Sequence, residues 1–145
     1  MKIKNKSLEL NNLLAIEQVC KKDEVVKLMA ELKKFIIDND LYPTGPVVYQ
    51  ILDERQESRN TYKVYIPINA SVKLSSDSQL EFINRISLES SLSCRVVDEE
   101  DLEMSKELLK LCAEQSDKRL IEPFYYVYLD GYGDPIFDIF SEIQD

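Results

Sequence analysis

The stretch Thr44–Leu52, which reads TGPVVYQIL, decides the fold because it is a clear strand signal that recurs later in the chain. A Gly-Pro turn opens it, and β-branched and aromatic residues follow, as is typical of strands. The stretch Pro123–Leu129, PFYYVYL, lies 77 positions further on, so that Tyr49 corresponds to Tyr126. This recurrence predicts a chain made of two similar halves.

The first half is predicted to contain a strand, a helix and two further strands. The helix opens at Asp23 and must end before Pro43, because a proline forces the preceding residue out of the helical region. Its apolar positions follow the helical spacing i, i+3, i+4, i+7, and they are Val25, Leu28, Met29, Leu32 and Ile36. Strands are expected over Ser7–Cys20, Val47–Leu52 and Tyr62–Ile68, with a polar loop over 53–60.

The second half is predicted to repeat this order. Asp98 is an N-cap for a helix whose inner face is expected to hold Leu102, Ser105, Leu108, Leu109 and Cys112. The strands are expected over Gln79–Val97, Phe124–Leu129 and Ile136–Ile143, with a turn at Asp130–Pro135 between the last two.

The predicted fold class is therefore α+β. It consists of a tandem duplication of a strand–helix–strand–strand unit, with an antiparallel sheet, two helices packed on one side and a cleft between the halves. We expect a single domain over 1–145, with pseudo-repeats at about 7–74 and 79–145.

Composition narrows the classes of function. The chain has 145 residues with 44% hydrophobic and 31% charged residues, an ordinary globular balance. Its net charge of −9 repels phosphates, so nucleic acid is not an expected partner, whereas a cationic small molecule or a basic protein is favoured. The same acidity also serves solubility alone. No apolar run is long enough to span a membrane.

Three separated cysteines, Cys20, Cys94 and Cys112, predict reduced thiols rather than a disulfide framework. The basic N-terminus is not followed by a continuous apolar segment, so a signal peptide is not expected and a cytoplasmic location is predicted. The sequence leaves the oligomeric state open.

Most familiar catalytic groups are missing. The sequence has no histidine, its three glycines lie in predicted turns, and no serine or cysteine lies in a recognisable nucleophile motif. We therefore predict a protein that is not an enzyme and that holds no cofactor and no metal. A hydrolase acting through a tyrosine and a carboxylate is a minor alternative.

Tyrosine is the residue type that stands out, with eight in the chain. Aromatic rings beside a shielded carboxylate suit an apolar cation, through cation–π attraction and charge pairing. The residues predicted to bind such a ligand are Tyr49, Tyr65, Tyr126, Tyr128, Asp138 and Phe140. The alternative is that the tyrosines only pack in the sheet, where this residue type is favoured.

The stretch Thr44–Tyr49, followed by Tyr62–Ile68 (YKVYIPI), resembles the first half of the gyrase-inhibitor-like (GyrI-like) superfamily. This superfamily includes the effector-binding domains of bacterial AraC- and MerR-type transcription activators. Tyr126–Leu129 with Phe137–Phe140 is similar to the pattern of its second half. The resemblance implies tandem strand–helix–strand–strand units and a ligand cleft between the halves.

The resemblance also implies that an acid on the last strand, here Asp138, meets the ligand, with Tyr49, Tyr65, Tyr126 and Phe140 lining the cleft. The chain departs from the family where Val97–Glu100 replaces the usual His-x-Gly-Pro and Ser141–Glu142 replaces the final "iP". No helix-turn-helix region is present, which predicts a stand-alone domain. Two functions follow: a non-enzymatic small-molecule-binding domain, or an acidic accessory or immunity-type factor that binds a basic protein partner.

Overall fold

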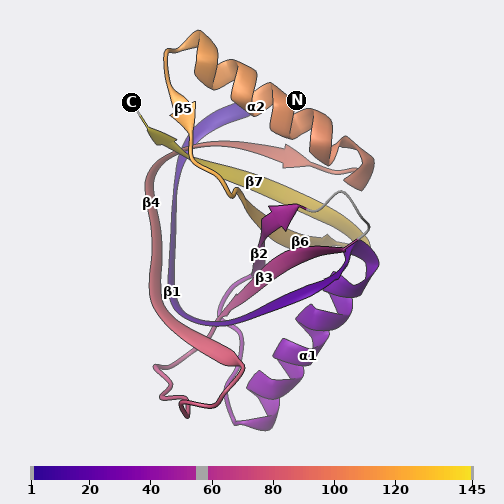
Figure 1. The fold of residues 1–145 in the computed structure, drawn as a ribbon, viewed down its shortest axis with the longest axis vertical. Coiled ribbons are helices and arrows are strands. Elements are labelled where there is room, and N and C mark those ends of the chain that lie inside the picture. Colours follow the sequence, from indigo (N-terminus) through magenta and orange to yellow (C-terminus); the bar gives the residue numbers. More distant parts are fainter. Residues whose placement is uncertain (1, 55–58, 145) are drawn as a thin grey trace. The chain divides into compact units, whose positions relative to one another are not determined.

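The computed structural model describes residues 2–54 and 59–144 (Figure 1). The chain divides into two compact units: a contiguous unit, Leu10–Ile86, and a split unit, Met1–Glu9 with Ser87–Asp145. The unit boundaries fall inside the two long strands, β1 (Ile3–Lys21) and β4 (Leu80–Val96). Each long strand therefore begins in one unit and ends in the other.

The contiguous unit has β3 as its central strand. Along the chain, β1 is followed by a 3₁₀ turn η1 (Lys22–Glu24), α1 (Val25–Asp38), β2 (Val47–Glu54) and β3 (Arg59–Pro67). The strand β3 pairs antiparallel with β1 on one side and with β2 on the other. The helix α1 packs against β3, and Figure 1 shows the two elements together.

The split unit has β7 as its central strand. After β4 come η2 (Glu99–Asp101), α2 (Leu102–Gln115), β5 (Arg119–Leu120), β6 (Tyr125–Gly131) and β7 (Asp134–Gln144). The strand β7 pairs antiparallel with β4, β5 and β6. The helix α2 packs next to β5, a short strand that had not been predicted from the sequence.

The predicted α+β class and the antiparallel strands are confirmed. The repeat is also visible in the bounds of the corresponding helices. Adding 77 to the residue numbers that bound η1 and α1 gives the bounds of η2 and α2. The two 14-residue helices thus correspond residue by residue. Since the compact units take strand segments from both halves, they do not coincide with the pseudo-repeats predicted at 7–74 and 79–145.

The predicted inner face of α1 is confirmed, because all five of its apolar positions are buried. The predicted inner face of α2 is partly wrong. Ser105 and Leu109 are buried as expected, but Leu108 is 38% exposed, and Ala113 is buried in a position that the prediction had not included. Successive residues are turned by about 100° around the helix axis. Leu109 takes the inner position, and Leu108 lies toward solvent.

Turn chemistry explains how the split unit forms its hairpin. Gly131 pairs with Asp134, which leaves Tyr132 and Gly133 as a two-residue loop. Both loop residues have positive φ, 57° and 93°, as a type I′ turn requires. Asp130 supports the turn, because its Oδ1 accepts a hydrogen bond of 2.8 Å from the Gly133 backbone N–H. The predicted turn at Asp130–Pro135 is therefore a tight hairpin.

The predicted N-cap at Asp98 is also confirmed, since its carboxylate accepts a 3.2 Å hydrogen bond from the Glu100 backbone N–H. Positions 55–58 of the predicted loop lie outside the described residues. In the part of the chain that the structure describes, no helix is both long and apolar enough to cross a lipid bilayer.

Candidate functional site

Cross-strand pairing places Asp138 and Phe140 on one face of the split unit. Directly paired residues project to the same side of a sheet, and this side alternates along each strand. Asp138 pairs with Val127 and Arg95, and Phe140 pairs with Tyr125 and Ser93. We call these residues the Asp138 face: Ser93, Arg95, Tyr125, Val127, Asp138 and Phe140.

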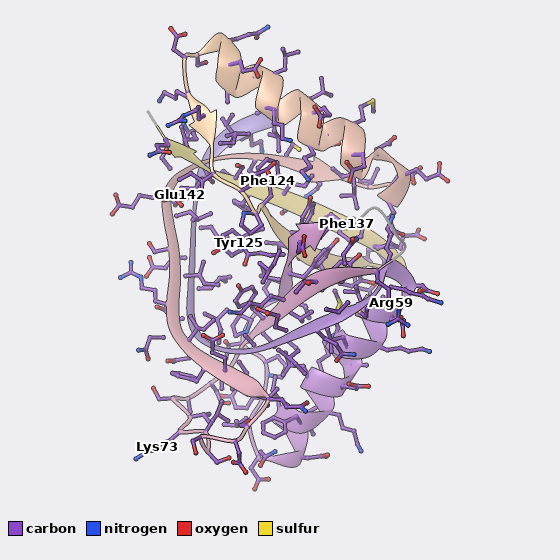
Figure 2. The ribbon with its side chains drawn as sticks, in the orientation of Figure 1. Arg59, Lys73, Phe124, Tyr125, Phe137 and Glu142 are labelled. Carbon is purple, nitrogen blue, oxygen red and sulfur yellow. The ribbon has the colours of Figure 1, made fainter. Side chains whose placement is uncertain are left out.

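The Asp138 face shields its carboxylate among apolar groups. The Asp138 side chain is 14% exposed, while Phe140 and Val127 are 7% and 6% exposed. Tyr125 is half-buried beside them, and Figure 2 shows it on β6. Two aromatic rings on a neighbouring rung, those of Tyr125 and Phe140, and a carboxylate with little access to water are the features that favour an organic cation.

The carboxylate of Asp138 is already held by Arg95. Arg95 Nε and Nη2 donate to the two carboxylate oxygens at 2.8 and 3.0 Å, a bidentate geometry. The hydrogen bond and the charge of Asp138 raise the pKa of Arg95 above its usual value. Since 58% of the Arg95 side chain is exposed and the Asp138 side chain is 14% exposed, the guanidinium lies on the solvent side of the carboxylate.

Tyr126 and Tyr128 lie on the opposite face of the same unit. Tyr126 pairs with Ile139 and is 4% exposed. Tyr128 pairs with Phe137, and the two rings meet edge to face with centroids 5.6 Å apart. The structure therefore does not bring these two tyrosines together with Asp138 and Phe140, and it places Tyr125 there instead.

In the contiguous unit, Tyr65 belongs to a polar cluster on one face of β3. Its hydroxyl donates a 2.5 Å hydrogen bond to Gln50 Oε1, and both residues are 5% exposed. The Nζ of Lys63 lies 5.5 Å from the centre of the Tyr65 ring and 2.7 Å from Glu81 Oε2. Tyr65 is thus held in place by the hydrogen bond of its hydroxyl to Gln50 and by the cation of Lys63 near its ring.

Tyr49 lies on the other face of this unit. It pairs with Val64, is 8% exposed, and its ring centre lies 6.3 Å from that of Tyr62. Tyr49 and Tyr65 are therefore separated by the sheet, as Tyr126 and Asp138 are in the split unit. The apolar side thus holds one predicted aromatic in the first half, Tyr49, and two in the second, Tyr126 and Tyr128.

The repeat gives the two faces matching positions with opposite charge. In the last strand of each half, Tyr65 corresponds to Phe140 and Lys63 to Asp138, both by a shift of 75. Each charge has a partner of the opposite sign, Glu81 for Lys63 and Arg95 for Asp138. Arg95, Gln50 and Tyr125 were not among the residues predicted from the sequence. The strand register that reveals them depends on pairing between distant segments.

Burial also fixes the chemistry of Cys94, which pairs with Ile139 on the apolar side of the split unit. Burial, and then the charge of Asp138, raise the pKa of Cys94 from 9.0 to about 11. The folded state therefore retains the thiol proton at pH values where the unfolded chain has lost it. We expect the free energy of unfolding to fall between pH 9 and 11 by about 2 kcal/mol through this residue.

Urea denaturation of the parent protein and of Cys94→Ala at pH 8, 9, 10 and 11 measures this contribution. Lysines and tyrosines also titrate in this range, but they do so in both proteins. The parent should therefore lose more stability than Cys94→Ala, and parallel pH profiles would contradict the assignment.

Comparison with known proteins gives fold relatives and a family. No curated protein matches the sequence. The C-terminal domain of EcmrR superposes with a TM-score of 0.74 at 13% identity, over 100% of this chain and 99% of that domain. EcmrR in a complex with DNA gives a TM-score of 0.77 at 12% identity, with 99% of this chain covered. The chain spans 58% of the length of that EcmrR chain.

Two further structures share the fold. SAV2435 bound to tetraphenylphosphonium has a TM-score of 0.57 at 13% identity, covering 99% of this chain and 94% of that one. A hydrolase from Listeria innocua has a TM-score of 0.65 at 9% identity, covering 97% and 92%. At such identities the likeness concerns the fold, and it supports the GyrI-like architecture that the sequence motifs predicted.

The family itself is given by the sequence. A match over residues 10–144 includes both helices and the paired strands of both units. The chain belongs to the family described as a domain of unknown function, DUF5085.

Proposed function

We propose that this protein is a non-enzymatic binding domain for an apolar organic cation, and that the Asp138 face receives the ligand. The observation that carries the proposal is the shielded carboxylate of Asp138 next to the Tyr125–Phe140 rung of the same sheet face. The fold relative SAV2435, which was solved with tetraphenylphosphonium, supports a ligand of this chemical class. The three thiols, none of them in a disulfide, suit action in the reducing cytoplasm.

In this proposal Arg95 is the resident counter-ion of Asp138. A ligand cation replaces the guanidinium beside the carboxylate, and Arg95 swings into solvent, where more than half of its side chain already lies. The ligand cation then pairs with the same carboxylate, so the exchange replaces one charge pairing of Asp138 by another. The apolar part of the ligand then gains contact with Tyr125 and Phe140.

The test is a titration with tetraphenylphosphonium followed by tyrosine fluorescence, which is readable because the sequence has no tryptophan. The parent protein should bind saturably, and Asp138→Asn should weaken binding about tenfold, because a charge-assisted contact contributes about 1.5–3 kcal/mol. The matched control is Glu142→Gln, the same change of charge two rungs further along β7, and it should alter the affinity less than twofold. Figure 2 labels Glu142 near the end of that strand.

Two results would contradict the proposal. Equal affinity of the parent and Asp138→Asn would remove the charge role, and absence of saturable binding in the parent would remove the ligand class. Substitution of Tyr65 or Tyr126 in the same titration reports whether the other aromatics contribute.

A second candidate function, the capture of a basic partner protein, is favoured by a different observation. Several large apolar side chains on α2 face solvent, and they are surrounded by acidic residues.

A further inference from the structure

Helix α2 carries an apolar line on its solvent side. Met104, Leu108 and Leu111 are 58%, 38% and 50% exposed. Their spacing of four and three residues places them one above another on a single side of the helix. This line, which we call the α2 stripe, lies well away from the buried side formed by Ser105, Leu109 and Ala113.

The repeat shows that the fold does not require apolar residues at these positions. The corresponding residues of α1 are Lys27, Glu31 and Lys34, and all three are exposed. The corresponding positions are thus charged on the helix of the contiguous unit and apolar on the helix of the split unit. Apolar side chains in water contribute nothing to the packed core, so the α2 stripe points to contact with another molecule.

An acidic border runs along the α2 stripe. Glu107 is three residues after Met104 and four before Leu111, so it lies beside both. Glu103 and Glu114 continue the border on the same side, and Asp101 stands on the other side of the stripe. The Nζ of Lys110 lies 3.7 Å from Glu107 Oε1 and is closer, at 3.1 Å, to Glu122 Oε1. The border therefore keeps a negative character, in a chain of net charge −9.

We propose that the α2 stripe and its acidic border form a docking surface for a basic amphipathic helix of a partner protein. Leucine-type side chains of the partner cover the stripe, and its lysines or arginines meet the border. A second copy of this chain would bring two acidic borders together, and an anionic lipid surface would repel the border as well. A basic helical partner is the occupant that satisfies both the apolar and the charged features.

The experiment uses the full chain and a synthetic probe. The probe is a 14-residue leucine–lysine peptide with leucines at helical spacing and an uncharged dye, followed by fluorescence anisotropy. The test variant is M104K/L108E/L111K, which installs the side chains that α1 carries at the same positions, so the fold should be retained. The matched control is V26K/I37Q, which changes the net charge equally by replacing two exposed apolar residues of α1.

We expect the test variant to bind the peptide at least tenfold more weakly than the parent, and the control variant to bind within twofold of it. A scrambled peptide of the same composition should bind the parent as weakly as the intact peptide binds the test variant. Circular dichroism and an unchanged tetraphenylphosphonium titration verify that the test variant is folded, and they separate this inference from the proposed ligand site.

Three results would overturn the inference. If the scrambled peptide bound the parent as tightly as the intact peptide, binding would depend on net charge alone. If the test variant bound the intact peptide as tightly as the parent, the peptide would bind outside the α2 stripe. Sedimentation that shows a parent dimer abolished by M104K/L108E/L111K would assign the surface to a second copy instead.

Discussion

Replacing Ile139 by alanine should lower the free energy of unfolding by about 2–5 kcal/mol, the usual range for a large apolar side chain removed from a packed core. Ile139 is fully buried on the central strand of the split unit, where it pairs with Cys94 in β4 and Tyr126 in β6. The cavity left by the substitution lies on a strand that is held by pairing with β4 and with β6, so it cannot close easily. Since domains are stable by about 5–15 kcal/mol, the variant should be close to unfolding.

Urea denaturation followed by circular dichroism measures the change. The matched control is Ile37→Ala on α1, where the same truncation removes a side chain that is 62% exposed, and it should cost less than about 1 kcal/mol. A loss below 1 kcal/mol for Ile139→Ala would show that β7 is not the core strand of its unit.

Removing the Tyr65 hydroxyl should destabilise the contiguous unit by about 1–2 kcal/mol. In Tyr65→Phe the ring remains but Gln50 Oε1 loses its buried donor, and a buried polar atom deprived of a hydrogen bond costs about 1–3 kcal/mol. Gln50→Leu should cost a similar amount, because the hydroxyl then loses its acceptor. The double variant should cost less than the two single variants together, since it removes both polar groups.

Denaturation of the four proteins completes the cycle. Tyr132→Phe is the control, because Tyr132 lies fully exposed in the hairpin loop and its hydroxyl remains in water. Strict additivity of Tyr65→Phe and Gln50→Leu would contradict a direct hydrogen bond between the two residues.

Helical and strand periodicity predicted most of the elements. The apolar spacing in Val25–Ile36 defines one buried side, and all of its members are buried. In α2 the pattern was ambiguous, because Leu108 and Leu109 are adjacent and both are apolar. A stripe made for a partner has the same hydrophobic signature as a stripe made for the core, so the sequence could not separate them.

The candidate site was less predictable than the elements. The alternation of side chains along β7 correctly placed Asp138 and Phe140 on the opposite face from Ile139. Which residues of β6 share the face of Asp138 depends on the strand register. The two-residue loop at Tyr132–Gly133 fixes that register, and a loop longer by one residue would have placed Tyr126 beside Asp138. Arg95 was harder to predict, because it lies 43 residues before Asp138 in the sequence.

The division of β1 and β4 between the units has a consequence for synthesis on the ribosome. The contiguous unit, Leu10–Ile86, is complete in an unbroken segment and can begin to fold while the chain is still growing. The split unit needs both Met1–Glu9 and β7, so it cannot be completed before β7 has been synthesised. A gene fragment that encodes only the second repeat would lack the opening segment of its own unit. The second repeat, although similar to the first in the order of its elements, should therefore be unable to fold as a separate protein.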